Sequence, residues 1–130
     1  QTVDGERKLI YHTNVMMCVA EKFVVICLDA IDNENERTLV KNTIEATNKE
    51  IVEISEEQMH QFAGNMLQLR NDNNEHFLVM SKSAYQSLKK EQLETIKKTS
   101  DIIYADLNTI EVNGGGSARC MLAEVFLPKK

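Results

Sequence analysis

The chain alternates between short apolar runs and polar breaks. Two apolar runs, residues 9–19 (LIYHTNVMMCV) and 23–31 (FVVICLDAI), flank the three residues AEK, and this spacing predicts a β-hairpin. Side chains along a strand point alternately to its two faces, so His12 and Asn14 are expected on the same face of the first strand. The second run is apolar on both faces, which predicts a strand buried between two layers.

A helix and a third strand are predicted next. The polar break 32–36 (DNENE) is interpreted as a loop, because it lacks the glycine and the terminal glutamate of a calcium-binding loop. Residues 37–49 then fit a helix with one apolar stripe. The members of this stripe are Leu39, Val40, Thr43, Ile44 and Thr47. The alternating segment IVEIS predicts a strand up to Ser55, and Ser55 with Gln58 gives a capping-box pattern for a helix that ends near Gly64.

The second half of the chain starts with another predicted hairpin. Its strands are residues 66–70 and 76–81, joined by the polar turn NDNNE. A helix capped by Ser81 or Ser83 follows, with an interruption near Lys90. Its inward-facing residues are expected to be Tyr85, Leu88, Leu93 and Ile96.

Two final strands, at residues 101–107 and 109–113, complete the predicted order. Residues 9–55 and 66–107 then share the succession hairpin, helix, strand. A repeat of about 45 residues is typical of arrays and propellers. The pattern therefore predicts an α/β fold built from ββαβ units.

Length and composition agree with a single domain. The chain has 130 residues, of which 42% are hydrophobic and 27% are charged, and these are ordinary values for a globular domain. The net charge of −5 argues against a nucleic-acid-binding surface. The longest apolar segment, FVVICL, is far shorter than the roughly 20 residues that span a bilayer. Neither nucleic acid nor a membrane is expected as a partner.

The three cysteines, Cys18, Cys27 and Cys120, match neither a metal site nor a disulfide framework. They predict a reducing, cytoplasmic location and no metal or other cofactor. Cys18 and Cys27 lie in apolar strands and are expected to be inert core residues.

Cys120 lies in the segment NGGGSARCM, where three glycines remove the Cβ atoms beside a thiol. Such a backbone can bend and approach a ligand closely, so Cys120 is a candidate nucleophile. The alternative is a flexible turn followed by a buried cysteine.

This segment resembles the C-terminal nucleophile motif of the guanidino-group-modifying enzymes: arginine deiminases, glycine amidinotransferases and dimethylargininases. IYHTNVMM is similar to the strand that carries the catalytic His of this family, and EEQMHQFAGNMLQL to its central helix-into-strand segment. The match runs from residue 10 to about 128 in the order of the family. It is closest to bacterial amidinotransferase-like hydrolases, including those assigned to citrulline breakdown.

The resemblance implies a five-bladed α/β propeller (a pentein) of ββαβ modules, of which the chain holds two and a fraction. Residues 1–130 are then expected to be the C-terminal part of one domain, and the start at Gln1 also suggests a fragment or a processed product. The missing N-terminal half would be the partner of the chain and would supply substrate-binding carboxylates. Self-association is the other expectation.

The resemblance also implies residue roles. Cys120 would be the nucleophile and His12 the acid and base, although a structural strand histidine is the alternative for His12. Asn65 would hydrogen-bond near the site, or cap a helix. Arg119 would lower the pKa of the thiol or hold a substrate carboxylate, or lie on the surface. Gly115 and Gly116 would offer backbone N–H groups.

Asn14 departs from the family, which usually carries Asp two residues after the His. An amide supplies no negative charge to a cationic guanidinium, so Asn14 favours a neutral ureido substrate such as citrulline. The function expected is a hydrolase or amidinotransferase that acts on a guanidino or ureido group through a covalent Cys intermediate, with the fragment alone inactive. The alternatives are a noncatalytic binding or assembly module and a cysteine hydrolase of another substrate class.

Overall fold

The computed structural model describes residues 1–125 and contains two ββαβ modules, as the repeat predicted. The first module consists of β3 (Met17–Val19), β4 (Phe23–Ile26), α1 (Glu34–Glu45) and β5 (Glu50–Glu53). The central strand β4 pairs with β3 antiparallel and with β5 parallel. The predicted hairpin around AEK is therefore confirmed, and all four residues of β4 are buried.

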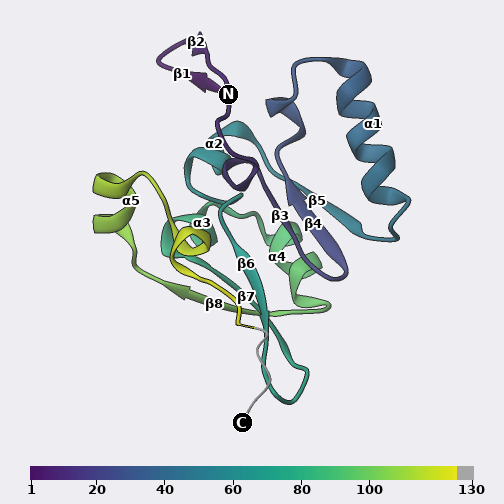
Figure 1. Cartoon of the computed structure of the whole chain (residues 1–130), viewed down its shortest axis with the longest axis vertical. Coiled ribbons are helices and arrows are strands. Elements are labelled where there is room, and N and C mark those ends of the chain that lie inside the picture. The colour runs from purple at the N-terminus through teal and green to yellow at the C-terminus, as the bar shows by residue number, and fades with distance from the viewer. Residues whose placement is uncertain (126–130) are drawn as a thin grey trace.

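The second module has the same topology. It consists of β6 (Leu67–Arg70), β7 (His76–Ser81), α3 (Lys82–Ser87), α4 (Lys90–Lys97) and β8 (Asp101–Ala105). The central strand β7 pairs with β6 antiparallel and with β8 parallel. Ser81 caps α3, and the helix is interrupted before Lys90, as predicted. Figure 1 shows the modules side by side, with α1 on the outer side of the first and α5 (Asn108–Gly114) at the opposite end of the molecule.

The modules share one hydrophobic core. Its buried members come from both sheets and from α4, and include Phe23, Val25, Val52, Leu78, Met80 and Ile96. Polar contacts add to this interface, since the Gln92 side chain donates to the Glu53 carbonyl at 2.6 Å. A smaller cluster joins β4 to α1 through Ile44, the only buried residue of α1, whereas Leu39 of the predicted stripe is 65% exposed.

The connection between the modules begins with α2 (Glu56–His60), whose capping box between Ser55 and Gln58 is confirmed. The prediction that Gly64 ends this helix is wrong. The left-handed residue that follows the helix is Phe62, with φ of 63°. Gly64 instead lies against the backbone of the first module. A Cβ there would be 2.4 Å from the Val15 carbonyl oxygen.

The strand predicted at residues 9–19 is wrong for most of its length. Thr13–Val15 form a 3₁₀ helix, η1, and only Met17–Val19 are in the sheet. The backbone N–H groups of Val15 and Met16 bond to His12 and Thr13 carbonyls, both at 3.0 Å. These local bonds replace the ladder that a strand would need, so His12 and Asn14 do not share a strand face.

Two further predictions need correction. Residues 109–113 are not a strand but part of α5. The loop predicted at 32–36 contains the start of α1, where the Asn33 side chain accepts the N–H groups of Asn35 and Glu36. The N-terminal tail forms a small hairpin, β1 (Thr2–Val3) and β2 (Glu6–Arg7), which Arg7 ties to Asp32 and Glu56. Phe126 and Leu127, in the last apolar run, lie outside the described residues.

None of the helices within residues 1–125 has the length and apolar character needed to cross a membrane.

Candidate active site

Three segments that are distant in the sequence meet at the side chain of Asn65. Its Nδ2 donates to the Asn14 carbonyl oxygen at 3.2 Å and lies 3.3 Å from Cys120 Sγ. Its Oδ1 accepts the Arg119 backbone N–H at 3.1 Å. Asn65 is only 5% exposed, so these contacts hold the turn after His12 and the turn around Cys120 against the end of the α2 connection. Asn14, Asn65, Arg119 and Cys120 are thus brought together.

Cys120 lies in a short 3₁₀ helix, η3 (Ala118–Met121), and is the exposed cysteine of the three. Cys18 and Cys27 are buried, and burial raises the pKa of the Cys18 thiol to about 12 and that of the Cys27 thiol above its ordinary value. A buried, protonated thiol is a poor nucleophile. Cys18, in β3, and Cys27, which follows β4, are therefore inert core residues, as predicted, and Cys120 is the accessible thiol.

At two of the three glycine positions the structure shows why a residue without a side chain is needed. Gly115 ends α5 in the left-handed conformation, with φ of 66°, where residues with a side chain are strained. A Cβ on Gly116 would lie 3.1 Å from Cys120 Sγ. Gly114 has space for a side chain, with the nearest atom 3.9 Å away. The Gly115 N–H already donates to the Glu111 carbonyl, so it does not offer the free donor that the sequence suggested.

His12 is exposed and precedes η1, with its Nδ1 accepting the Asn14 N–H at 3.1 Å. A neutral imidazole that accepts at Nδ1 carries its proton on Nε2. The Nδ1 contact therefore orients the ring and leaves Nε2 as the nitrogen that can face a ligand.

Arg119 contributes its backbone rather than its side chain to this arrangement. Its N–H bonds to both oxygens of Asn65, the backbone one at 3.3 Å. Within residues 1–125 its guanidinium makes no hydrogen bond or ion pair.

A cavity of about 210 Å³ adjoins this cluster. Asn65 and Gly115 line it, and the remaining lining residues are Gln1, Tyr11, Val15, Met59, His60 and Phe62. No carboxylate is among them. Tyr11 and His60 were not among the residues predicted for a site, and no local pattern marks either, because the cavity forms only when α2 packs beside η1.

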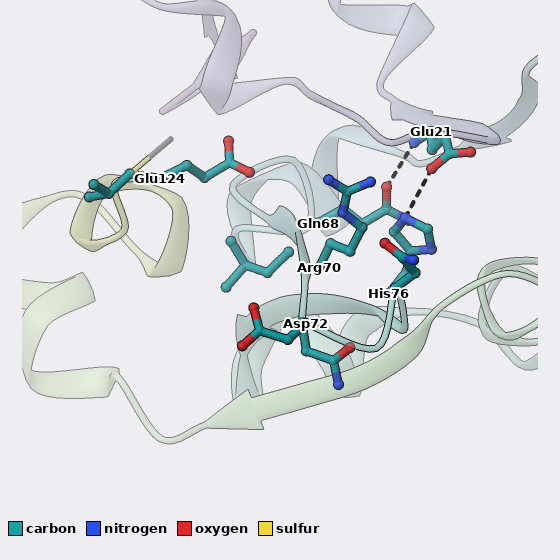
Figure 2. A pocket seen from close by; sticks show the side chains of 10 residues that line it. Glu21, Gln68, Arg70, Asp72, His76 and Glu124 are labelled. Carbon is teal, nitrogen blue, oxygen red and sulfur yellow. Dashed lines mark hydrogen bonds and ion pairs between the residues drawn. The ribbon is translucent and has the colours of Figure 1, made fainter. Parts of the chain in front are cut away.

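A larger cavity, of about 610 Å³, lies between the tips of the two hairpins (Figure 2). None of the predicted site residues lines it. His76 Nε2 lies 2.9 Å from a Glu21 carboxylate oxygen at its edge, and the Glu21 N–H donates to the Gln68 side chain at 2.8 Å. These contacts join the hairpins and give the half-buried His76 a structural partner. The described part of the chain holds no group of three or more side chains suited to a metal ion.

Comparison with known proteins identifies a family for the chain. The family model for eukaryotic N,N-dimethylarginine dimethylhydrolases matches residues 1–127. None of the curated protein sequences matches the chain. The apo structure of ArgZ, an arginine dihydrolase from the ornithine–ammonia cycle in cyanobacteria, is 17% identical with a TM-score of 0.63, over 92% of this chain and 17% of that one.

Two structures of the N-terminal domain of ArgZ are also similar. The product-bound domain is 15% identical, with a TM-score of 0.60, over 85% of this chain and 36% of that one. A substrate-bound cysteine-to-serine mutant is 14% identical, with a TM-score of 0.59, over 84% and 36%. The chain thus spans little more than a third of these structures at most, and at such identities the likeness shows the fold alone. Because the family model covers nearly its whole length, the chain belongs to the N,N-dimethylarginine dimethylhydrolase family, within the guanidino-group-modifying enzymes.

Proposed function

We propose that the chain carries the thiol and imidazole part of the active site of a C–N hydrolase that acts on the guanidino or ureido group of an arginine- or citrulline-like substrate. One observation carries the proposal: Asn65 Nδ2 lies 3.3 Å from Cys120 Sγ and 3.2 Å from the carbonyl of Asn14, two residues after His12. Membership of the dimethylarginine dimethylhydrolase family supports the reaction class.

In the proposed mechanism, the Cys120 thiolate attacks the central carbon of the guanidino or ureido group. A C–S bond forms and the C–N bond to the leaving nitrogen breaks. His12, in its imidazolium form, gives the Nε2 proton to the departing amine and becomes neutral. His12 then takes a proton from water, whose oxygen attacks the same carbon. The C–S bond breaks and the thiolate is regenerated. The reaction consumes one water and needs no redox partner.

Asn65 would stabilise the attacking form of Cys120. A hydrogen bond donated to a thiolate favours the charged form over the thiol, which is the same effect that a nearby cation produces. The amide is held by two other contacts, so it is oriented before the substrate arrives.

The residues that line the cavity bear on whether the substrate group is charged or neutral. A cationic guanidinium needs carboxylates, and the cavity beside Asn65 has none among its lining residues. Asn14 offers an amide where the family usually places Asp. We propose that this part of the site tolerates a neutral ureido group, and that the N-terminal modules of a closed five-module propeller supply the charges for a cationic substrate. An amine in place of water as acceptor would make the enzyme an amidinotransferase.

The test is turnover by the full-length protein of arginine, N-methylated arginines and citrulline, with the released ammonia or methylamines measured. Wild type should process at least one of them, and Cys120→Ser should abolish that activity. Ser87→Ala is the control, because the Ser87 hydroxyl bonds the Ala84 carbonyl on α3. Equal turnover by wild type and Cys120→Ser would contradict the proposal.

A further inference from the structure

A buried carboxyl group, that of Glu111 in α5, connects two other segments through serine hydroxyls. The Ser117 hydroxyl donates to one of its oxygens and the Ser83 hydroxyl to the other, both at 2.6 Å. Glu111 is 9% exposed and Ser117 is fully buried. Within residues 1–125, no Lys, Arg or His forms an ion pair with Glu111. Burying a carboxyl group costs free energy unless its oxygens accept hydrogen bonds or pair with a cation. The two serine hydroxyls provide these hydrogen bonds for Glu111.

The hydroxyl network is continuous with the cap of α3. Ser81 Oγ accepts the Ala84 N–H at 3.2 Å and lies 2.9 Å from Ser83 Oγ. Because the Ser83 proton is given to Glu111, Ser81 must be the donor in the pair of serines. Every hydroxyl then has a defined direction, from the start of α3 to the carboxyl group.

On its other side, Glu111 holds the beginning of the turn that carries Cys120. Ser117 is the residue before η3, and its carbonyl accepts the Cys120 N–H at 3.0 Å. Asn65 holds the same turn at Arg119. The residues just before Ser117 are Gly115 and Gly116, which have no side chains to anchor the backbone. Side-chain hydrogen bonds therefore tie the turn at two points, and Glu111 makes one of them.

We propose that Glu111 is a positioning residue, which sets the place of the Cys120 thiol by holding Ser117 against α3. This inference rests on the proposed function, because it gives Cys120 a catalytic position to keep. Loss of the carboxyl group frees Ser117 and lets the turn pivot about its contact with Asn65. The thiol then leaves the Asn65 amide, and misplacement of a reacting group by about 1 Å can cost on the order of a hundredfold in rate.

The experiment compares variants of the full-length protein. Glu111→Ala should lower kcat by about 10- to 100-fold with little change in KM, since substrate binding does not use Glu111. Glu111→Gln should recover most of the activity, because its amide can accept from one serine and donate to the other. Ser117→Ala should lower kcat as Glu111→Ala does, again with little change in KM. Ser87→Ala is the matched control, because it removes a hydroxyl from the same helix as Ser83 but one that bonds the Ala84 carbonyl, and kcat should not change.

Alkylation of Cys120 by iodoacetamide is the second readout, measured on protein shown by circular dichroism to be folded. Glu111→Ala should slow it, because the thiolate loses the Asn65 donor. Wild-type kcat and alkylation in Glu111→Ala would overturn the proposal, as would losses that Glu111→Gln fails to recover. If Glu111→Ala does not fold, Ser117→Ala decides by the same criteria. If wild type turns over no guanidino or ureido compound, the proposed function fails, while the alkylation rates still decide the role of Glu111.

Discussion

At the residue scale, the three cysteines differ in solvent exposure, which decides whether a thiol can reach a substrate. Cys18 and Cys27 are buried with raised pKa values, whereas Cys120 is exposed beside an amide donor. Iodoacetamide at neutral pH should therefore label Cys120 in the full-length protein well before the other two, as read by peptide mapping. The buried cysteines are the internal control, and preferential labelling of either one would refute the assignment.

His12 should act on turnover rather than on binding. Its Nδ1 contact to the Asn14 N–H leaves Nε2 as the nitrogen that exchanges protons with the leaving group and water, and general acid–base catalysis contributes roughly 10² to 10⁴ in rate. We expect His12→Ala to lower kcat by that order while KM changes little. His76→Ala is the matched control, because His76 pairs with Glu21 away from the site. A His12→Ala variant with wild-type kcat would remove His12 from the mechanism.

At the scale of elements, Gly64 is expected to be irreplaceable and Gly114 dispensable. A Cβ on Gly64 would lie 2.4 Å from the Val15 carbonyl oxygen and 2.8 Å from the Met16 carbonyl carbon, and overpacking costs about 1–3 kcal/mol or more. Gly64→Ala should therefore lower the free energy of unfolding in urea, whereas Gly114→Ala, which meets no close atom, should leave it unchanged or raised. Equal effects of the two changes would show that the close approach of these segments is misplaced.

The sequence predicted the elements that local rules govern. The capping box at Ser55, the cap at Ser81 and both hairpins depend on neighbouring residues, and each is present. The same rules failed where tertiary packing decides. Ile110 and Val112 favour a strand by propensity, yet their segment is helical, with Gly115 as its left-handed end.

For the candidate site too, local motifs were readable from the sequence, whereas contacts between distant segments were not. The motifs named Cys120 and Asn65 as candidates, but the contacts that bring Asn14, Asn65 and Cys120 together join residues more than 50 positions apart. Glu111 gave no signal at all, because its partners Ser83 and Ser117 come from separate segments. Side-chain networks of this kind follow from the packed fold and not from spacing.

At the scale of the whole molecule, the outer edge of the second module leaves apolar side chains uncovered. Ile103 and Tyr104 of the edge strand β8 and Ile110 and Val112 of α5 are between 41% and 73% exposed. Apolar patches of this kind usually mark interaction sites, and in repeat architectures they pack on the next unit. Since the chain spans only 17% to 36% of its structural relatives, we expect a further module to cover this edge in the full-length protein.

The 130-residue chain alone should then self-associate and show no turnover. Sedimentation velocity across micromolar concentrations should detect the association, and the full-length protein should serve as the active, non-associating control. Separation from the rest of the pocket removes the groups that orient substrate, so activity should be lost even in folded material. A compact monomer with turnover near that of the full-length protein would show that the chain is a complete small enzyme.

The central claim is that Cys120 becomes covalently bonded to the carbon of the substrate. The most direct measurement is acid quenching of the full-length protein during turnover, followed by mass spectrometry of its peptides. We predict an added mass equal to the substrate less its leaving amine, found on the peptide that contains Cys120 and absent from Cys120→Ser. Full turnover by Cys120→Ser, or an adduct on a peptide that lacks Cys120, would contradict the account.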